Sequence, residues 1–555
     1  MLSGGHVIIS RDRARLSALP RLLAFGAALV GIAAWVVFFR TGLVLSHYDA
    51  KAHLVVARRV FDSLTPGWQQ IGAVWLPLPH LIDLLPSQVD FFYRTGLFAS
   101  GVSIACLAIT AYAAARLILH LTGSAAGACA AAALLVFNPN LLYLHTTPMT
   151  EPLLIAASML VVLWLVEWVD SDSGEVPARL ATALFAAMWT RYEAWPIVTS
   201  ALAAAGYATW RRSGSFAVVV QRGWRLVIWP AVAVAIFLIN SRITVGAWFV
   251  SDGFYVPDPS YAHKPLRTLM GLWWGTHQLS GYMVEAAGLL SAAVALSRAL
   301  TRKQDAVLLI PIALFTAAAV PFVAFYDGHP YRIRYMVPLV AASAVLAGLG
   351  VGLARPFQRR AGPLGPAGSF GPTALATVAP IVLVVSLFIE SPLWNMQAPM
   401  LVEAQWDRAA SVGRRAVTTC LAHEYRGEKV LASMGSLAHY MQELSNAGFA
   451  IHDFIHEGNG DIWSLAMQTG PAPHAGWMLV EEVAEGGDVL AEHIRRDPSF
   501  TRGMARVCEG GGVALYKRMQ DARFKMQSGV PNPEIQNHEG REVHDDDKSR
   551  SSRPS

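Results

Sequence analysis

The chain has 555 residues, of which 54% are hydrophobic and only 15% are charged. A soluble protein of ordinary composition carries about 25% charged residues, so this composition excludes a purely soluble protein. The formal net charge of +5 comes from basic residues in short loops between apolar runs, which is an orientation signal for a membrane protein, and we expect no nucleic-acid partner. The apolar runs end before Pro399. We therefore predict a transmembrane domain over 1–395 followed by a small soluble domain.

The apolar runs predict an α-helical polytopic membrane protein. A helix needs about 20 apolar residues to cross the hydrocarbon core, and the sequence offers about eleven such runs when tilt and short spans are allowed. The predicted spans cover 21–43, 91–119, 125–144, 150–169, 179–195, 196–210, 225–249, 271–297, 305–325, 335–354 and 374–394.

The distribution of arginine predicts the orientation of these spans. Four arginines precede the first span, between Arg11 and Arg21, so the N-terminus is expected in the cytoplasm. Alternation from there places the basic loops near 211–225 and 298–303 inside as well. The loop 44–90 and the short turns near 150, 192 and 330 then lie outside. An odd number of spans makes everything after Ser391 extracytoplasmic.

The first outside loop, 44–90, has structure of its own. Residues 52–63 have helical periodicity, which Thr65-Pro66-Gly67 ends, and a second amphipathic segment begins at Trp75. Both segments are typical of helices that lie in the plane of the membrane interface.

The region 396–520 predicts a small extracytoplasmic α/β domain. Helical patterns and strand patterns alternate along it. Cys420 and Cys508 could form a disulfide if the domain is exported, but two cysteines alone leave the pairing open. The polar tail 521–555 is predicted to be disordered. Helices are expected at 402–421, 436–444 and 489–495, and strands at 429–434, 448–454, 477–480 and 512–517.

Asp49 is the leading candidate for a catalytic residue. It lies where the first span meets the outside loop, in the run His47-Tyr48-Asp49-Ala50-Lys51-Ala52-His53, and a carboxylate at such a place is a functional-site hypothesis. It could deprotonate an acceptor hydroxyl or amine that attacks the anomeric carbon of a sugar, and one base suffices when the leaving group is a phosphate. Tyr48 and His53 would then position the substrate. The alternative is a capping aspartate at a helix end.

Glu151 is the second acidic candidate. It begins a predicted span between Thr150 and Pro152. It could act beside Asp49 by positioning an acceptor, or share a divalent cation such as Mg or Mn with it. The alternative is a carboxylate that only complements a helix dipole. The nearby histidines show no metal-ligand spacing, so the metal stays unknown.

Arginines in the outside turns are candidates for binding a phosphate. Arg332 and Arg334 lie in a short outside turn, where arginine is uncommon, and a guanidinium binds phosphate with two hydrogen bonds. Lys51 and Arg58 are less specific candidates for the same role. The alternative is a structural ion-pair network.

Arg191 and Glu193 lie together at the end of a predicted span. Arg191 could be a further phosphate contact, and Glu193 could position the substrate. The alternative is a structural ion pair beside the aromatic anchor Trp195.

The sequence has no motif for several other kinds of chemistry. There is no P-loop, dinucleotide fingerprint, zinc motif or convincing Ser-His-Asp arrangement. A site that faces the outside also has no access to cytoplasmic nucleotide sugars, whereas a lipid-linked donor can reach it.

These motifs together resemble the GT-C superfamily of integral membrane glycosyltransferases. The closest likeness is to its branch of protein O-mannosyltransferases and lipid A aminoarabinose transferases. The resemblance rests on Tyr48-Asp49 opening a long outside loop, Thr150-Glu151-Pro152, Thr190-Arg191-Tyr192-Glu193 and Arg334-Tyr335. It extends over about 1–395 and implies that Asp49 is the base and that the donor is a polyprenyl-phosphate sugar.

One departure from that family leaves the acceptor open. Many of its mannosyltransferases have an adjacent Asp-Glu pair, whereas Ala50 follows Asp49 here. The exported domain is similar in placement to those of bacterial relatives, which implies a role in receiving the acceptor.

The leading hypothesis is an inverting glycosyltransferase of the cytoplasmic (inner) membrane. It would move a sugar from a polyprenyl-phosphate donor to an extracytoplasmic acceptor, which is a glycan, lipid or protein. A transporter or flippase for a lipid-linked or anionic solute is the alternative, although its polar residues are expected near the midplane and not at one face. A third hypothesis is a membrane anchor that presents the C-terminal domain as a binding module.

Overall fold

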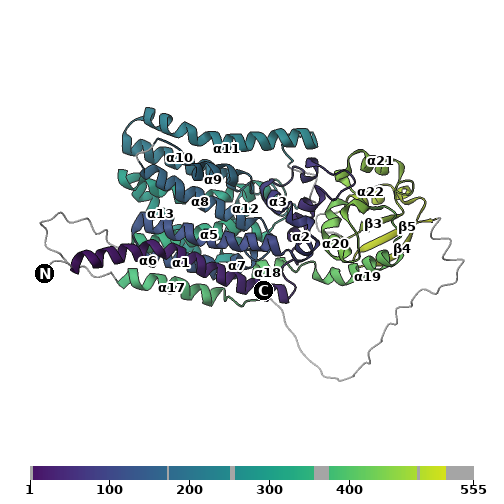
Figure 1. Cartoon of the computed structure of the whole chain (residues 1–555), viewed down its shortest axis with the longest axis horizontal. Coiled ribbons are helices and arrows are strands. Elements are labelled where there is room, and N and C mark those ends of the chain that lie inside the picture. Colours follow the sequence, from purple (N-terminus) through teal and green to yellow (C-terminus); the bar gives the residue numbers. More distant parts are fainter. Residues whose placement is uncertain (1–3, 172–173, 251–256, 355–373, 484–487, 520–555) are drawn as a thin grey trace, which may run out of the picture.

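A computed structural model describes residues 4–171, 174–250, 257–354, 374–483 and 488–519. The protein has two parts, a large helical bundle and a small α/β domain at one end of it (Figure 1). The predicted disordered tail, 521–555, lies outside the described residues.

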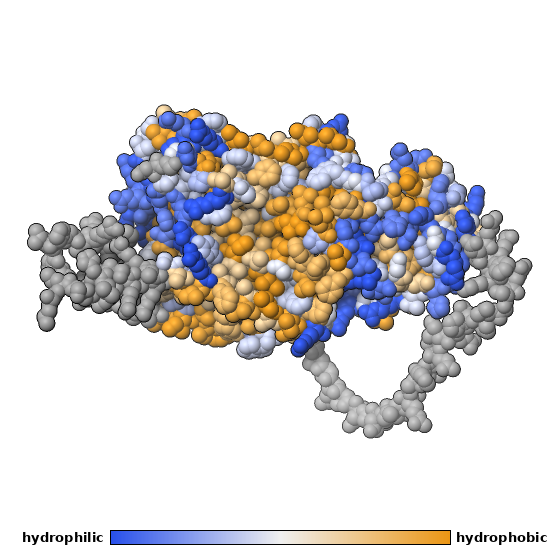
Figure 2. All heavy atoms as spheres, viewed as in Figure 1, coloured by the Kyte–Doolittle hydropathy of each residue, from blue (hydrophilic) through white to orange (hydrophobic). Residues whose placement is uncertain are grey.

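The helical bundle confirms the prediction of a polytopic membrane protein. Within the described residues, seven helical stretches are long and apolar enough to cross a membrane, and three shorter apolar helices accompany them. Apolar residues cover the middle of the bundle and hydrophilic residues gather towards its two ends (Figure 2). The helices of the bundle are α1 (Gly4–Arg40), α5 (Leu97–Thr122), α6 (Ala125–Val136), α7 (Pro139–Leu144), α8 (Glu151–Asp170), α9 (Ala178–Met188), α10 (Ala194–Ser213), α11 (Phe216–Val245), α12 (Pro265–Ser280), α13 (Tyr282–Thr301), α14 (Leu309–Ile312), α15 (Ala319–Tyr326), α16 (Val337–Leu353) and α17 (Ala374–Glu390).

Some predicted spans differ in detail from these helices. The run 271–297 forms two helices, α12 and α13, because Gly281 between them has a positive φ of 83°, a conformation that interrupts a helix. The run 305–325 begins as a 3-10 helix over Lys303–Leu308 and contains a second one over Ala313–Ala318.

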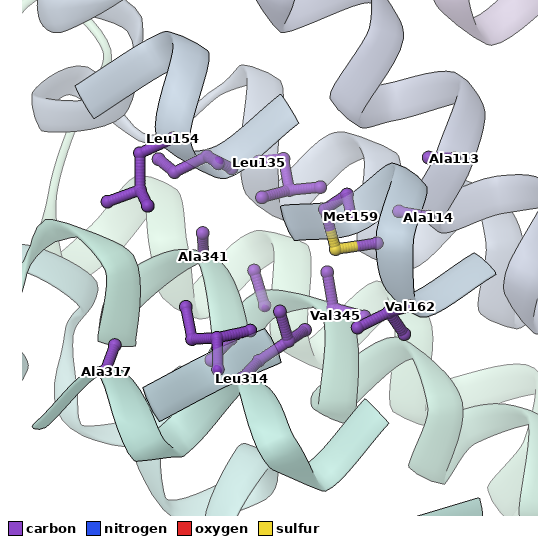
Figure 3. Packing of buried hydrophobic residues seen from close by; sticks show 14 of the residues in the cluster. Ala113, Ala114, Leu135, Leu154, Met159, Val162, Leu314, Ala317, Ala341 and Val345 are labelled. Atoms are coloured by element: carbon purple, nitrogen blue, oxygen red, sulfur yellow. The ribbon is translucent and has the colours of Figure 1, made fainter. Parts of the chain in front are cut away.

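Helix α16 forms the centre of the bundle. It is apolar on all sides and almost every residue in it is buried, as expected for a helix surrounded by other helices. A Cβ atom added to Gly127 of α6 would lie 2.6 Å from the carbonyl oxygen of Gly348 in α16, so only glycine allows this approach. Figure 3 shows the core beside it, where Leu135, Met159 and Val345 from three helices point towards one another.

The loop 44–90, which the sequence predicts to be the first outside loop, lies between the bundle and the C-terminal domain (Figure 1). Its longest helix, α2, is buried along most of its length and packs against α20 of the domain. The loop contains α2 (Tyr48–Arg59), a 3-10 turn (Trp68–Ile71), α3 (Leu78–Asp83), a second 3-10 turn (Pro86–Gln88) and α4 (Asp90–Thr95).

The C-terminal domain has the predicted α/β class. Its five-stranded sheet has the order β2-β1-β3-β5-β4. Strand β1 is parallel to β2 and β3, whereas β5 is antiparallel to both β3 and β4. The domain and its connection to the bundle contain α18 (Pro399–Glu403), α19 (Arg408–Glu424), β1 (Val430–Ala432), α20 (Met434–Asn446), β2 (Phe454–Ile455), α21 (Asp461–Thr469), β3 (Trp477–Glu481), α22 (Val489–Arg496), β4 (Met504–Gly510) and β5 (Val513–Arg518).

A disulfide joins α19 to the edge strand β4. It links Cys420 and Cys508, which are 88 positions apart in the sequence. The pairing that the sequence left open is therefore made in the structure, and it closes nearly the whole domain.

Candidate functional site

Asp49 lies in the first turn of α2. His47 caps this helix, and its Nδ1 accepts a hydrogen bond from the backbone N–H of Asp49 at 3.1 Å. Only 7% of Asp49 is exposed, and its carboxylate forms an ion pair with Arg334. His47, and not Asp49, is therefore the residue that caps α2. The carboxylate of Asp49 instead contacts the buried guanidinium of Arg334.

Arg334 comes from a 3-10 turn, Ile333–Met336, that begins α16. It is buried and lies between two carboxylates, because Glu403 Oε1 is 3.8 Å from its Nε. Glu403 ends α18, and its Oε2 accepts a hydrogen bond from the backbone N–H of Ile333 at 3.2 Å. Its Oε1, which faces Arg334, also lies 3.5 Å from His47 Nε2. Glu403 therefore links the turn of Arg334 to the cap of α2.

Sequence reasoning did not identify Glu403. Its only signal is an acidic residue soon after the last apolar run, and such a residue is ordinary in the first helix of a soluble domain. Its three partners come from two other parts of the chain, so the role of Glu403 emerges only from the fold.

A second ion-pair group surrounds Arg191. Its guanidinium lies 3.2 Å from Glu151 Oε1 and 2.9 Å from Glu193 Oε1, and it donates a hydrogen bond of 2.9 Å to Thr150 Oγ1. Glu151 is only 1% exposed. A buried carboxylate is costly unless it is paired, so Arg191 is what allows two carboxylates to remain here.

His53 connects the two groups. It lies four residues after Asp49 and therefore on the same face of α2, and its Nδ1 is 3.0 Å from His80 Nε2. Burial lowers the pKa of His53 well below its usual value, and the charges of Arg191 and Arg334 lower it further while Asp49 acts against them. His53 is thus neutral and within electrostatic reach of both groups.

The pKa of Asp49 follows from its neighbours. Burial alone would raise the pKa of this carboxyl, but the charge of Arg334 and the hydrogen bond it donates hold that pKa below its usual range. Asp49 is therefore ionised at neutral pH. As long as Arg334 remains its partner, it is also a weak base.

The other cationic candidates lie in different surroundings. The guanidinium of Arg332 lies 5.8 Å from the ring centre of Trp406. Arg58 pairs with Asp62 at 2.9 Å and with Asp90 at 2.7 Å. The structure does not bring Arg58 into contact with Asp49 or Arg334 within the described residues.

Tyr48 and Lys51 face the C-terminal domain. The hydroxyl of Tyr48 donates a hydrogen bond of 2.7 Å to the carbonyl of Gly435. Burial lowers the pKa of the Lys51 ammonium, and the strongest influence against this is the carboxylate of Asp407. Both residues therefore hold α2 against the domain, on either side of Asp49 in the sequence.

No metal-binding cluster accompanies these residues. Among the described parts of the chain, no three His, Cys, Asp or Glu side chains are grouped so that they could hold a metal ion. Asp49 and Glu151 each have an arginine as partner. The sequence left open whether a divalent cation such as Mg or Mn binds here, and the described residues assign no site to one.

These residues belong to a polytopic helical bundle that carries a small α/β domain at one end. The chain is similar to the crystal structure of ArnT from Cupriavidus metallidurans bound to undecaprenyl phosphate, with a TM-score of 0.54 and 12% sequence identity. The match covers 88% of this chain and 98% of the ArnT chain. At that identity the likeness shows the fold, which is the one the sequence motifs implied. No family model and no curated protein sequence matches the chain.

Proposed function

We propose that the protein is an inverting glycosyltransferase that moves a sugar from a polyprenyl-phosphate donor to an extracytoplasmic acceptor. The observation that carries the proposal is the buried ion pair between Asp49 and Arg334. It combines a base and a phosphate-binding group in one contact. The fold that surrounds it is shared with a protein whose crystal structure holds undecaprenyl phosphate.

Asp49 acts as the general base in the proposed reaction. An acceptor hydroxyl attacks the anomeric carbon from the face opposite the phosphate, and its proton passes to the Asp49 carboxylate. The bond between the anomeric carbon and the phosphate oxygen breaks, and polyprenyl phosphate leaves with the electron pair. One displacement inverts the configuration, and the leaving phosphate needs no second acid.

Arg334 couples donor binding to the strength of this base. In the free protein its charge is shared between Asp49 and Glu403. A donor phosphate that binds Arg334 competes with Asp49 for the guanidinium, and a carboxylate that loses its cationic partner has a higher pKa. Asp49 thus becomes a better base when a donor is in place.

Arg191 has a supporting role in this proposal. Two carboxylates lie close to its guanidinium, at 3.2 Å and 2.9 Å, whereas the second carboxylate beside Arg334 is more distant, at 3.8 Å, so Arg334 has more to offer a phosphate. Arg191 fixes Glu151 and Glu193 beside the reaction centre, where they position the acceptor. Arg332, at the other end of the same short turn as Arg334, is the better second phosphate contact, and Lys51 and Arg58 are left out of the site.

The position of the polar residues favours an enzyme over a transporter. Both ion-pair groups lie where the bundle meets the first outside loop, next to the exported-type domain (Figure 1). Transport sites are expected near the midplane of the membrane.

The first test replaces Asp49 by asparagine. Asp49→Asn keeps the size of the side chain but removes the base, so we expect turnover to fall by about 10²- to 10⁴-fold. The assay uses purified protein in nanodiscs, a panel of radiolabelled polyprenyl-phosphate sugars and extracts of cell-surface glycans and lipids as acceptors. Release of polyprenyl phosphate is measured with and without EDTA, which reports on the predicted cation.

Asp90→Asn is the matched control. Asp90 is a carboxylate of the same loop, but it is half-exposed and pairs with Arg58 and Arg94. This variant should keep wild-type turnover. An Asp49→Asn protein that is as active as the control would refute the assignment of the base.

A further inference from the structure

Basic residues gather at the end of the bundle that lies away from the C-terminal domain, where α10 and α13 end (Figures 1 and 2). Several of these residues are balanced by carboxylates. The ion pairs join Arg116 and Arg179 to Glu167, Arg212 to Asp170, and Arg298 to Asp305. A structural role is sufficient to explain the arginines of these pairs.

Three cations at the same end have no such partner. Among the described residues, no carboxylate lies within ion-pair distance of Arg211, Arg302 or Lys303. Nη2 of Arg211, in the last turn of α10, donates a hydrogen bond of 3.1 Å to the carbonyl of Leu300 in the last turn of α13. Arg302 and Lys303 directly follow α13, and the 3-10 helix that begins at Lys303 packs against α10. Three positive charges are therefore close together without compensation, and an anion beside them would be attracted by all three.

Aromatic side chains indicate the depth of this basic cluster (Arg211, Arg302 and Lys303) in the membrane. The guanidinium of Arg211 lies 5.8 Å from the ring centre of Tyr207, which in turn lies 5.9 Å from the ring centre of Trp210. Trp210 is 44% exposed. Exposed Trp and Tyr side chains at the end of an apolar helix are typical of the headgroup region of a bilayer. The basic cluster is therefore at the level of lipid phosphates.

The surface of α13 next to the basic cluster is apolar. Leu296 and Leu300 lie one helical turn apart on this helix and are 43% and 51% exposed. The helix is long and apolar enough to cross a membrane, so these side chains face acyl chains. A lipid with its phosphate at the basic cluster can contact both surfaces, whereas a free phosphate ion can contact only the first.

We propose that the basic cluster is a binding site for the phosphate of an anionic phospholipid, in the leaflet at this end of the bundle. Nη1 of Arg211 donates to no described residue, so it can donate to a phosphate oxygen, and Arg302 and Lys303 add exposed charges. A zwitterionic lipid carries an ammonium group that cancels the charge of its phosphate, so the cluster prefers a lipid with a net negative charge. The proposal does not rest on the proposed function, because the cluster lies at the opposite end of the bundle from Asp49.

The first experiment measures this preference by native mass spectrometry of the full chain purified in detergent. The probes are phosphatidylglycerol and phosphatidylcholine with identical acyl chains. We expect the wild type to bind phosphatidylglycerol about tenfold or more tightly than phosphatidylcholine. The variant Arg302→Gln/Lys303→Gln removes the two exposed charges of the cluster and should reduce the preference to about twofold.

The matched control is Arg179→Gln/Arg212→Gln. It also removes two positive charges from the same end of the bundle, but the affected carboxylates, Glu167 and Asp170, each keep another partner. This control should keep the wild-type preference. The readout is a ratio of two lipids on the same protein, so a general loss of folded protein cancels. The proposal is overturned if the control loses as much preference as the cluster variant, or if the wild type binds both lipids equally.

The second experiment locates the bound lipid. Leu300→Cys, in a background without the free cysteines Cys106 and Cys129, is labelled with a bimane fluorophore. Phosphatidylglycerol with brominated acyl chains should quench this fluorophore more than brominated phosphatidylcholine does. At the control position Ile32→Cys, exposed on α1, the two lipids should quench equally.

Inorganic phosphate in large excess distinguishes a lipid site from a site for a free anion. It should relieve the quenching at Leu300→Cys no more than chloride at the same ionic strength, because it makes no contact with the apolar surface of α13. A specific relief by phosphate, or equal quenching by both lipids at Leu300→Cys, would contradict the proposal.

Discussion

The guanidinium of Arg334 has two carboxylates as neighbours, and they differ in origin. Asp49 comes from the first outside loop, and Glu403 comes from the connection to the C-terminal domain. Glu403 touches neither sugar nor phosphate in the proposed reaction. It acts through Arg334 and through the cap residue His47, which makes it a positioning residue.

Replacing Glu403 by glutamine tests this role. Glu403→Gln keeps an oxygen for the backbone N–H of Ile333 but removes one negative charge beside Arg334. Asp49 is then the only carboxylate beside the Arg334 guanidinium, so the ion pair between them becomes stronger and Asp49 becomes a weaker base. We expect kcat to fall about tenfold while the KM for the anionic donor decreases, because the site is less negative.

The two kinetic constants separate positioning from damage. Glu492→Gln, an exposed acid of α22, serves as the control and should change neither constant. A loss of stability alone would lower the amount of active enzyme without changing the KM. A raised donor KM with an unchanged kcat would contradict the positioning role.

The sequence predicted which residues gather but not how they pair. The common orientation of the outside turns was enough to expect Asp49, Glu151, Arg191 and Arg334 near one another. It could not assign Arg334 to Asp49 and Arg191 to Glu151, because those partners depend on helix rotation within the bundle. Asp83 of α3, whose buried Oδ1 has no hydrogen-bond partner among the described residues, escaped notice for the same reason, since burial without a partner leaves no mark in a sequence.

At the level of elements, prediction worked where a pattern was strong and local. The helix α20 and the strands β3 and β5 lie close to their predicted positions. β4 was not predicted, because it is an edge strand with a single buried residue and no regular alternation of buried and exposed positions. The predicted strand 448–454 is reduced to β2 because Asp62 accepts hydrogen bonds from the backbone N–H groups of Ile451 and His452.

The disulfide between α19 and β4 allows a test at this scale. It closes a loop of 88 positions, and a cross-link of that span stabilises by about 2–4 kcal/mol, mainly by restricting the unfolded chain. We expect the double variant Cys420→Ser/Cys508→Ser to unfold its C-terminal domain at a lower temperature. Limited proteolysis of the full chain during heating measures this.

A free cysteine provides the control for the disulfide. Cys129 lies exposed on α6, so Cys129→Ser should leave the proteolysis curve unchanged. A reducing agent should lower the temperature at which the wild-type domain becomes sensitive to proteolysis to that of the double variant. Equal curves for all proteins would show that the cross-link does not support the domain.

Glu457, in the 3-10 turn after β2, predicts a pH dependence. Burial raises the pKa of this carboxyl from its usual 4.5 to about 7, although the backbone N–H of Met434 acts against the shift. Because the folded pKa lies above the unfolded one, the stability this group contributes is complete below pH 4.5 and is lost as the pH rises through 7. The loss amounts to at most about 3 kcal/mol.

Unfolding midpoints between pH 5 and 8 measure this effect. Glu457→Gln cannot ionise, so its stability should decrease less with rising pH than that of the wild type. Burial also raises the pKa of Asp83 to about 7, and some slope should therefore remain until Asp83→Asn is added. A Glu457→Gln protein with the full wild-type slope would contradict the assignment.

For the whole molecule, the strongest expectation is its orientation in the membrane. The basic loops that follow α10 and α13 lie at the end of the bundle away from the C-terminal domain, together with the acidic turn that follows α8 (Figure 1). There Arg212 pairs with Asp170, and Arg222 donates a hydrogen bond to the carbonyl of Ser171. Arginine-rich short loops stay in the cytoplasm, so the C-terminal domain is predicted outside.

Cysteine labelling tests the orientation. In a background without the free cysteines Cys106 and Cys129, we expect Ser499→Cys to react with a membrane-impermeant maleimide added to spheroplasts. Ser213→Cys should react only after lysis. The reverse pattern would place the candidate site in the cytoplasm and remove the argument for a lipid-linked donor.

The general architecture was predictable because long apolar runs have few ways to fold in a membrane. The details that escaped prediction come from close packing and short helices. The 3-10 stretches between Lys303 and Tyr326 leave no interruption in hydropathy, so the apolar run hid them. The break at Gly281 does have a signal, because the polar residues His277 and Gln278 precede it.

The position of α2 also constrains how the protein is made. Tyr48 is synthesised early, but the carbonyl to which it donates a hydrogen bond belongs to Gly435, 387 positions later. The carbonyl of Lys51 likewise accepts a hydrogen bond from the side chain of Gln442, 391 positions later. Nearly all of the bundle must be inserted before these contacts can form. A nascent or truncated chain therefore carries Asp49 on a helix that lacks these contacts, so the site cannot become complete until the C-terminal domain has folded.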